Sequence, residues 1–308
     1  MRGYVRRMLD DARIFHVNVN CSDLARSRAF YVECCGLAAG AHTAPEAVQD
    51  GTAFGLELAR WDAWILVGER GFDGGAIDLL EWQEPAPVGR PPRSLADSGF
   101  QRIGVRVPDL DAALPRAAAH GSATWGEPDA HALPDGGQVR IAFVSDPDGV
   151  AIELVEGGTD GLSFVGVTCR DLERSVGFYR ALGFRELARF PSGRDDGARL
   201  RIDGPVTMVE VLMGAPGRGA VHLMLVGFEQ PRVEARSPRD ANTLGIWRTA
   251  MLVPDVDAAV AALRAADIEP MSDPQVMAMG PGLPDLRFVC FRGPDQEVIE
   301  LIEQPRAA

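Results

Sequence analysis

The sequence lacks the features that mark secreted, membrane-spanning and nucleic-acid-binding proteins. Its 308 residues include only five cysteines, an odd number without CxxC spacing, which argues against a disulfide framework or a thiolate zinc site. No apolar run approaches the roughly 18 residues that span a bilayer, and no apolar stretch of signal-peptide length follows the N-terminal arginines. Basic residues number 31 against 44 acidic ones, a net charge of −13, so nucleic acid and acidic membranes are repelled. We expect a cytoplasmic protein without nucleic-acid or membrane partners.

What the sequence does have is an internal repeat. The offset between matching segments is nearly constant, from 146 residues (Val107 to Val253) to 148 residues (Cys21 to Cys169). The matching pairs are CSDLARSRAFYVECCGL with CRDLERSVGFYRALGF, VPDLDAAL with VPDVDAAV, and RIAFVSDPDGVAIELVE with RFVCFRGPDQEVIELIE. A fixed offset of this kind indicates a duplicated architecture.

A shorter pattern occurs twice in each half and predicts four modules, at about 13–84, 100–156, 161–230 and 245–304. Each module opens with an apolar or alternating strand, continues with an aspartate suited to cap a helix, and ends in three strands. The sequence therefore predicts an α+β fold of tandem βαβββ modules in two paired-module domains. The glycine-rich segment EGGTDG places the boundary between an N-terminal domain, 1–158, and a C-terminal domain, 159–308. We expect the two modules of each half to pair into one cupped sheet.

The opening strand, the motif DLxRSxxFY and the closing DPDGxxIELVE resemble the vicinal oxygen chelate superfamily of glyoxalases, bleomycin-resistance proteins and extradiol dioxygenases. The resemblance covers nearly the whole chain. It implies that paired modules form a cup around a small molecule, with metal ligands on the first and last strands of each module. Those positions hold His16, Asp78, Arg102 and Glu153 in the first half, and Phe164, His222, Arg248 and Glu300 in the second.

Both halves depart from the metal-binding pattern, because each has an arginine at a ligand position. A guanidinium stays protonated and has no lone pair to give, although it pairs well with a carboxylate. We therefore expect Arg102 to pair with Glu153 and Arg248 with Glu300, without a tightly bound metal or other cofactor. The alternative is one divalent ion (Zn, Ni, Mn or Fe) held by His16, Asp78 and Glu153, with Arg102 turned away.

His16 and Glu153 are the candidate catalytic residues. His16 shares one face of its strand with Asn18, and Glu153 is a carboxylate in the apolar strand VAIELVE, where it must be paired, protonated or bound to metal. A structural ion pair is an equally good interpretation of Glu153, and a hydrogen-bonded core histidine is the alternative for His222. The candidate substrate-binding residues are Asn18, Asp78, Arg102, His222, Arg248 and Glu300.

The resemblance leaves three kinds of function open. An extradiol dioxygenase is rejected, because Phe164 and Arg248 occupy two of the three positions that would bind iron. The remaining hypotheses are a metal-independent lyase or isomerase, a natural-product-binding protein similar to bleomycin-resistance proteins, and a metal-dependent enzyme of the glyoxalase, epimerase or transferase type. In each case we expect a small hydrophobic or carbonyl-bearing ligand, and a monomer or homodimer.

Overall fold

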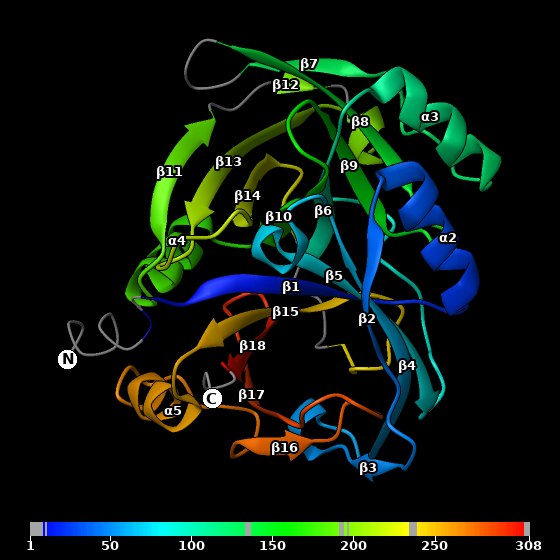
Figure 1. The fold of residues 1–308 in the computed structure, drawn as a ribbon. Helices are drawn as coiled ribbons and strands as arrows, with labels where there is room; N and C mark the ends of the chain where they lie inside the picture. The colour runs from blue at the N-terminus through cyan, green and yellow to red at the C-terminus, as the bar shows by residue number, and fades with distance from the viewer. Residues whose placement is uncertain are drawn as a thin grey trace.

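The computed structural model describes Leu9 and residues 11–132, 137–190, 194–195, 197–233 and 239–304 (Figure 1). The predicted α+β series of four βαβββ modules is confirmed. The first module comprises β1 (Arg13–Asn20), α2 (Leu24–Cys35), β2 (Ala38–Thr43), β3 (Gln49–Asp50), β4 (Leu58–Val67) and β5 (Ala76–Glu84), and the second comprises β6 (Gly99–Val107), α3 (Leu110–Ala119), β7 (Asp129–Ala132), β8 (Gln138–Ser145) and β9 (Ala151–Glu156). The third comprises β10 (Gly161–Cys169), α4 (Leu172–Ala181), β11 (Arg185–Phe190), β12 (Arg194–Asp195), β13 (Val206–Gly214) and β14 (His222–Gln230), and the fourth comprises β15 (Gly245–Val253), α5 (Val256–Arg264), β16 (Gln275–Met277), β17 (Leu286–Arg292) and β18 (Val298–Glu303).

The repeated aspartate begins each of these helices. Asp23 Oδ1 accepts the backbone N–H of Arg26 at 2.9 Å, which satisfies a donor that the first helical turn leaves unpaired. The same cap is made at the other three helices by Asp109, Asp171 and Asp255. None of the helices in the described ranges is long and apolar enough to cross a membrane.

The strands form two nine-stranded sheets, and each sheet combines one module from each half of the chain. The first sheet joins the first and fourth modules in the order β16-β17-β18-β15-β1-β5-β4-β2, with β3 paired to β4 as its ninth strand (Figure 1). The second joins the second and third modules in the order β11-β13-β14-β10-β6-β9-β8-β7, with β12 paired to β13 as its ninth strand. Our expectation that each half pairs its own modules was therefore wrong. The short link 157–160 keeps β9 and β10 close, whereas the longer segment 85–98 lies between β5 and β6. The domain boundary after residue 158 stays a prediction.

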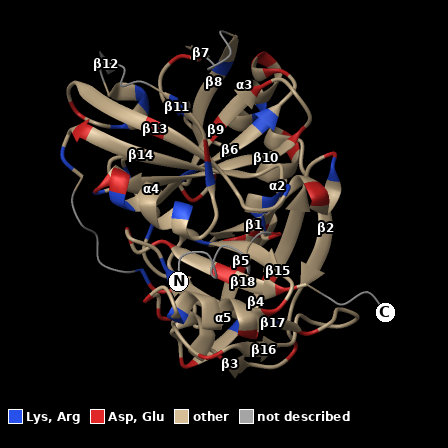
Figure 2. Cartoon of the chain, turned by 90° about the vertical axis from the view of Figure 1, so that its left-hand side faces the viewer, with Lys and Arg blue, Asp and Glu red and all other residues tan. Residues whose placement is uncertain are grey.

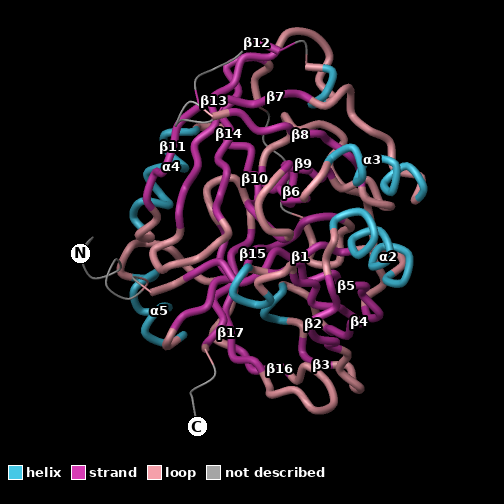
Figure 3. The backbone as a smooth tube through the Cα atoms, turned by 45° about the horizontal axis from the view of Figure 1, so that its top comes forward, coloured by secondary structure: helices cyan, strands magenta, loops and turns pink. Residues whose placement is uncertain are grey.

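The helices lie outside the curved sheets, with α2 and α3 together on one side and α4 and α5 on the other (Figure 3). The main hydrophobic core lies under these helices, and it takes the alternate residues Val17 and Val19 of β1. His16, Asn18 and Asn20 point to the opposite face of the same strand, because side chains alternate along a strand. A smaller cluster of buried apolar residues lines the concave face of each sheet. Acidic and basic residues are interspersed over the molecule in the view of Figure 2.

The helix motif of one module is held by a turn of another module in the other sheet. Tyr31 of α2 donates its hydroxyl to Asp146 Oδ2 at 3.1 Å, in the turn after β8. Tyr179 of α4 donates its hydroxyl to Glu297 Oε1 at 2.7 Å, in the turn before β18. The residues that carry the sequence repeat therefore hold the two sheets against each other.

Replacing Asp146 and Glu297 by Asn and Gln should flatten the pH dependence of stability. Burial raises the pKa of each carboxyl to about 7, although the hydrogen bonds that it accepts oppose this rise. In the unfolded chain the same groups ionise near pH ~4. The folded state therefore holds protons that the unfolded state has lost, so stability falls as the pH rises from about 4 to about 7.

We expect the double variant D146N/E297Q to lose less stability than wild type over that interval, and to be the more stable protein at slightly alkaline pH. Urea denaturation at a series of pH values measures both effects. Asp109→Asn, at a solvent-exposed helix cap, is the matched control. Parallel pH profiles for the double variant and wild type would contradict the expectation.

Candidate functional site

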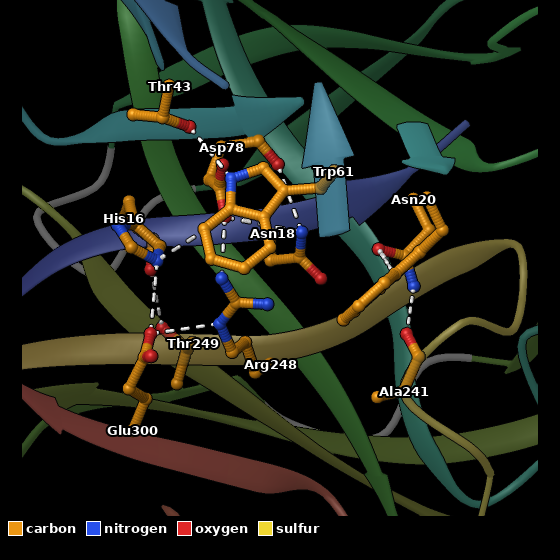
Figure 4. A network of polar contacts seen from close by, with 11 residues as sticks. His16, Asn18, Asn20, Thr43, Trp61, Asp78, Ala241, Arg248, Thr249 and Glu300 are labelled. Carbon is orange, nitrogen blue, oxygen red and sulfur yellow. Dashed lines mark hydrogen bonds and ion pairs between the residues drawn. The ribbon is translucent and has the colours of Figure 1, made fainter. Parts of the chain in front are cut away.

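One polar cluster lies on the concave face of the first sheet, which we call the first cup. Strand pairing brings it together: His16 pairs with Ala250, and Ala250 pairs on its other side with Glu300. Asp78 pairs with Asn18, so its side chain lies on the same face. The cluster consists of side chains from β1, β5, β15 and β18: His16, Asp78, Arg248 and Glu300 (Figure 4).

Arg248 bridges the two carboxylates of the first cup. Its Nε lies 2.9 Å from Glu300 Oε2, and its Nη2 lies 2.8 Å from Asp78 Oδ2. The side chains of Arg248, Asp78 and Glu300 are only 7%, 5% and 5% exposed. His16 stands beside this bridge, with Nε2 3.4 Å from Glu300 Oε2 and 3.8 Å from Asp78 Oδ2. The predicted pairing of Arg248 with Glu300 is confirmed.

The bridge keeps Arg248 and Glu300 charged despite their burial. Burial acts to raise the pKa of Glu300, but Arg248 and His16 outweigh it and lower that pKa to about 2. Burial likewise acts to lower the pKa of Arg248, and Glu300 and Asp78 outweigh it so that the pKa is raised. One guanidinium therefore faces two carboxylates, and its charge is more than balanced before any ligand enters.

Buried polar residues of β1 and β15 make further hydrogen bonds around this cluster. Asn18 donates its Nδ2 to Asp78 Oδ2 at 3.3 Å and to the Asp78 carbonyl at 3.2 Å. Thr249 donates its hydroxyl to the His16 carbonyl at 3.1 Å. Asn20 lies further along β1 and donates to the carbonyl of Ala241 at 2.6 Å. Asn18, a predicted substrate-binding residue, therefore makes its hydrogen bonds to Asp78 in this structure.

The first cup encloses a cavity of about 200 Å³ beside the polar cluster. Its lining is mostly apolar, and Phe54 and Phe288 stack in it with ring centroids 5.2 Å apart. Met279, Leu283 and Leu286 of the fourth module also line the cavity. The segment that carries them is joined to the first module by Gln49, which accepts the N–H of Ala278 at 2.7 Å and donates to its carbonyl at 3.0 Å. The cavity thus has one charged wall and an apolar remainder.

The second sheet has an equivalent cup that is almost filled, and we call it the second cup. Arg102 lies 2.7 Å from Glu153 and 2.5 Å from Glu210, so the predicted Arg102–Glu153 pair is confirmed. Phe164 holds the position of His16 there, because it pairs with Gly104 as His16 pairs with Ala250. A cavity of only about 20 Å³ remains beside these residues.

Glu210 is the residue of the second cup that the sequence analysis missed. It stands alone as a carboxylate in the apolar strand β13, which is the signal that singled out Glu153. Burial acts to raise the pKa of Glu210, but Arg102 and His131 outweigh it and lower that pKa to about 2. The pKa of Glu153 is instead raised, because burial and the Glu210 carboxylate outweigh the attraction of Arg102. His131 Nε2 lies 3.8 Å from Glu210 Oε2.

The four ligand positions predicted for each half do not converge. His16 and Asp78 share the first cup with Glu300 and Arg248, whereas Arg102 and Glu153 lie in the second cup. The predicted partnership of His16 with Glu153 is therefore wrong, since the two residues belong to different sheets.

The equivalence of His222 with Asp78 was also wrong. Met224 holds that position, because it pairs with Gly166 as Asp78 pairs with Asn18. His222 stands two residues earlier and pairs with Phe164. Burial lowers the pKa of the His222 imidazole.

Comparison with known proteins identifies the family. The model of the Glyoxalase/Bleomycin resistance protein/Dioxygenase superfamily matches residues 13–154 and 161–301. The chain belongs to this superfamily. Similar superfamily members from Arabidopsis thaliana include a "Probable lactoylglutathione lyase, chloroplastic", 28% identical over 58% of this chain and 46% of that protein, and a lactoylglutathione lyase, 36% identical over 30% of this chain and 32% of that protein. The matches thus span less than half of these relatives.

Solved structures show the same fold across nearly the whole chain. Glyoxalase I from Zea mays superposes with a TM-score of 0.65 at 20% identity, over 95% of this chain and 92% of that one. A protein described as a dioxygenase from Bacillus subtilis superposes with a TM-score of 0.59 at 12% identity, over 96% and 86% of the two chains. At these identities the likeness establishes the fold.

The donor set of the first cup does not fit a metal ion as the side chains stand. A divalent cation needs lone pairs from imidazole and carboxylate, and Arg248 already engages one oxygen of each carboxylate. The guanidinium offers no lone pair and carries a like charge. Among the described residues, no group of three or more His, Cys, Asp and Glu side chains is arranged to hold a metal. All five cysteines are buried as free thiols.

Arg248→His should turn the first cup into a divalent metal site. It would place a second imidazole beside His16, Asp78 and Glu300, giving two nitrogen and two carboxylate ligands. We expect about one equivalent of zinc to be retained after dialysis, as measured by elemental analysis. Adding His16→Ala should abolish this binding. A metal-free Arg248→His variant would contradict the equivalence of Arg248 with a ligand position.

Arg102→Met should destabilise the protein by about 3–5 kcal/mol, because it leaves Glu153 and Glu210 buried with only the partly exposed His131, 3.8 Å from Glu210, as a positive partner. The triple variant Arg102→Met/Glu153→Gln/Glu210→Gln removes both charges as well, and should recover most of this loss. Urea denaturation near neutral pH measures the difference. A loss of unfolding free energy below about 1 kcal/mol, as for an exposed pair, would show that the bridge of Arg102 to Glu153 and Glu210 does not stabilise the protein.

Proposed function

We propose that the first cup binds a small organic molecule without a resident metal ion, and that the protein acts on it as a metal-independent lyase or isomerase. The observation that carries this proposal is the cavity of about 200 Å³ bounded by His16 and Arg248, against about 20 Å³ in the second cup. In this proposal Arg248 donates a hydrogen bond to the ligand in place of a metal ion.

His16 is the proposed acid–base residue. Neither of its ring nitrogens makes a hydrogen bond to a described residue, although its side chain is only 6% exposed. A buried imidazole beside the ligand can take a proton from the ligand or return one to it. Arg248 would donate a hydrogen bond from its unused Nη1 to the ligand oxygen during this transfer. Glu300, rather than Glu153, is the carboxylate that accompanies His16.

Two other functions would use the same cup. A natural-product-binding protein would hold the ligand without turnover, which the largely apolar lining also favours. A metal-dependent enzyme is favoured by the names of the relatives, and would require Arg248 to turn away so that His16, Asp78 and Glu300 become ligands. Deuterium exchange at the carbon next to the oxygen of a bound ligand distinguishes catalysis from binding without turnover. If His16→Gln loses this exchange but still binds the ligand, the result would support catalysis.

Elemental analysis of protein purified without chelator distinguishes the metal-dependent enzyme from the proposed metal-independent one. We expect less than stoichiometric metal. One equivalent of divalent metal that is lost on His16→Ala would overturn the proposal and favour the metal-dependent enzyme.

Leu283→Trp should abolish binding of a small aromatic probe such as ethylbenzene. Leu283 lines the cavity from a loop, so the larger side chain fills the space without disturbing a strand. Calorimetry or NMR line broadening of the probe measures binding. Leu187→Trp makes the same change at a side chain that is 50% exposed on β11, and should leave binding unchanged. Equal affinity for the two variants would place the site elsewhere.

A further inference from the structure

We infer that the ligand of the first cup is uncharged and presents a carbonyl-type oxygen to the wall formed by Arg248 and His16, with one flat ring in the apolar part of the cavity. This inference rests on the proposed function and specifies the class of molecule. It excludes carboxylates and phosphates, which an arginine in a binding pocket would otherwise suggest.

The charge of the wall argues against an anion. Arg248 is paired at 2.8 Å and 2.9 Å with two carboxylates, Asp78 and Glu300. The three groups together carry one negative charge, and a protonated His16 would only bring the sum to zero. A further carboxylate would enter a buried site with no uncompensated positive charge to receive it, which is unfavourable in a low-dielectric surrounding.

The free hydrogen-bonding groups argue for an acceptor. Arg248 uses Nε and Nη2 for its carboxylates, whereas Nη1 is buried and makes no hydrogen bond to a described residue. The ring nitrogens of His16 are also buried without a hydrogen bond to a described residue, although Nε2 lies 3.4 Å from Glu300 Oε2. Nη1 can only donate, so a ligand ammonium group cannot satisfy it but a carbonyl oxygen can. A neutral oxygen therefore meets both the charge and the donor requirement.

The apolar part of the cavity sets the size and shape of the rest of the ligand. A cavity of about 150 Å³ lined by apolar side chains holds benzene. The cavity of the first cup, about 200 Å³, therefore has room for one ring with a short substituent. Phe54 stacks on Phe288 at an interplanar angle of 27° and stands nearly perpendicular to Trp61, at 86°. Flat aromatic walls of this kind suit a planar ring by stacking or edge contact.

A matched series of probes tests the inference on the unmodified protein. Acetophenone carries the carbonyl, α-methylstyrene replaces its oxygen by a methylene group of similar shape, benzoate adds a negative charge, and benzylamine adds a positive one. Isothermal titration should show acetophenone binding about tenfold more tightly than α-methylstyrene, the ratio expected for one hydrogen bond to a charged donor. Benzoate and benzylamine should bind more weakly than acetophenone.

Variants locate the effect in the first cup. The triple variant Arg248→Met/Asp78→Asn/Glu300→Gln removes the bridge as a unit, so no lone buried charge is left, and should bind acetophenone and α-methylstyrene equally. The corresponding triple variant of the second cup, Arg102→Met/Glu153→Gln/Glu210→Gln, is the control and should keep the tenfold preference.

The outcomes separate this inference from the proposed function. If α-methylstyrene binds as tightly as acetophenone, or if benzoate or benzylamine binds more tightly, the cup binds small molecules but the inferred ligand class is wrong. If no member of the series binds, the proposed function fails and the inference fails with it. A preference for acetophenone that persists in the first-cup variant would also overturn the assignment to Arg248.

Discussion

A buried guanidinium held between two carboxylates is the interaction on which both cups depend. Each bridge joins strands of different modules, since Arg248 of the fourth module binds Asp78 of the first, and Arg102 of the second module binds Glu210 of the third. Buried charges are tolerated only when their partners are in place. The bridges therefore fix the register of the two module pairs as well as the electrostatics of the concave faces.

Much of the fold follows from local sequence signals. The four aspartates predict the helix starts, and the alternation along β1 separates the core residues Val17 and Val19 from the polar face. The arginine–glutamate pairs were predictable because Arg102 and Glu153 lie on neighbouring strands of one module, as Arg248 and Glu300 do. What lies within a module can be deduced from the sequence of that module.

The choice of partner module could not be deduced in the same way. All four modules present similar first strands, so the repeat does not distinguish a neighbour in the chain from a distant one. The composition of each site depends on that choice, which is why His16 was assigned to Glu153 instead of Glu300. Glu210 was missed for a related reason: it replaces the carboxylate of Asp78 from a different strand, β13, and no spacing relates the two positions.

Each cup contains an arginine bridge between two carboxylates, and the two cups differ mainly in the residues beside it. In the first cup His16 lies next to Ala250. In the second cup the ring of Phe164 lies over Gly104 so closely that an added Cβ there would come within 2.1 Å of it. A glycine thus makes room for an aromatic ring where the other cup leaves space for a ligand. Small local changes give one framework an open cup and a filled one.

The crossed pairing of modules makes the chain equivalent to a symmetric dimer whose subunits have been joined end to end. In a true homodimer every substitution occurs twice, so both sites must change together. Here each position occurs once, and a ligand site can be kept in one sheet while its counterpart is converted to packing. Because every module contributes strands to only one sheet, while its helix or its turn is bound to the other, the two cups can diverge in sequence but cannot separate in space.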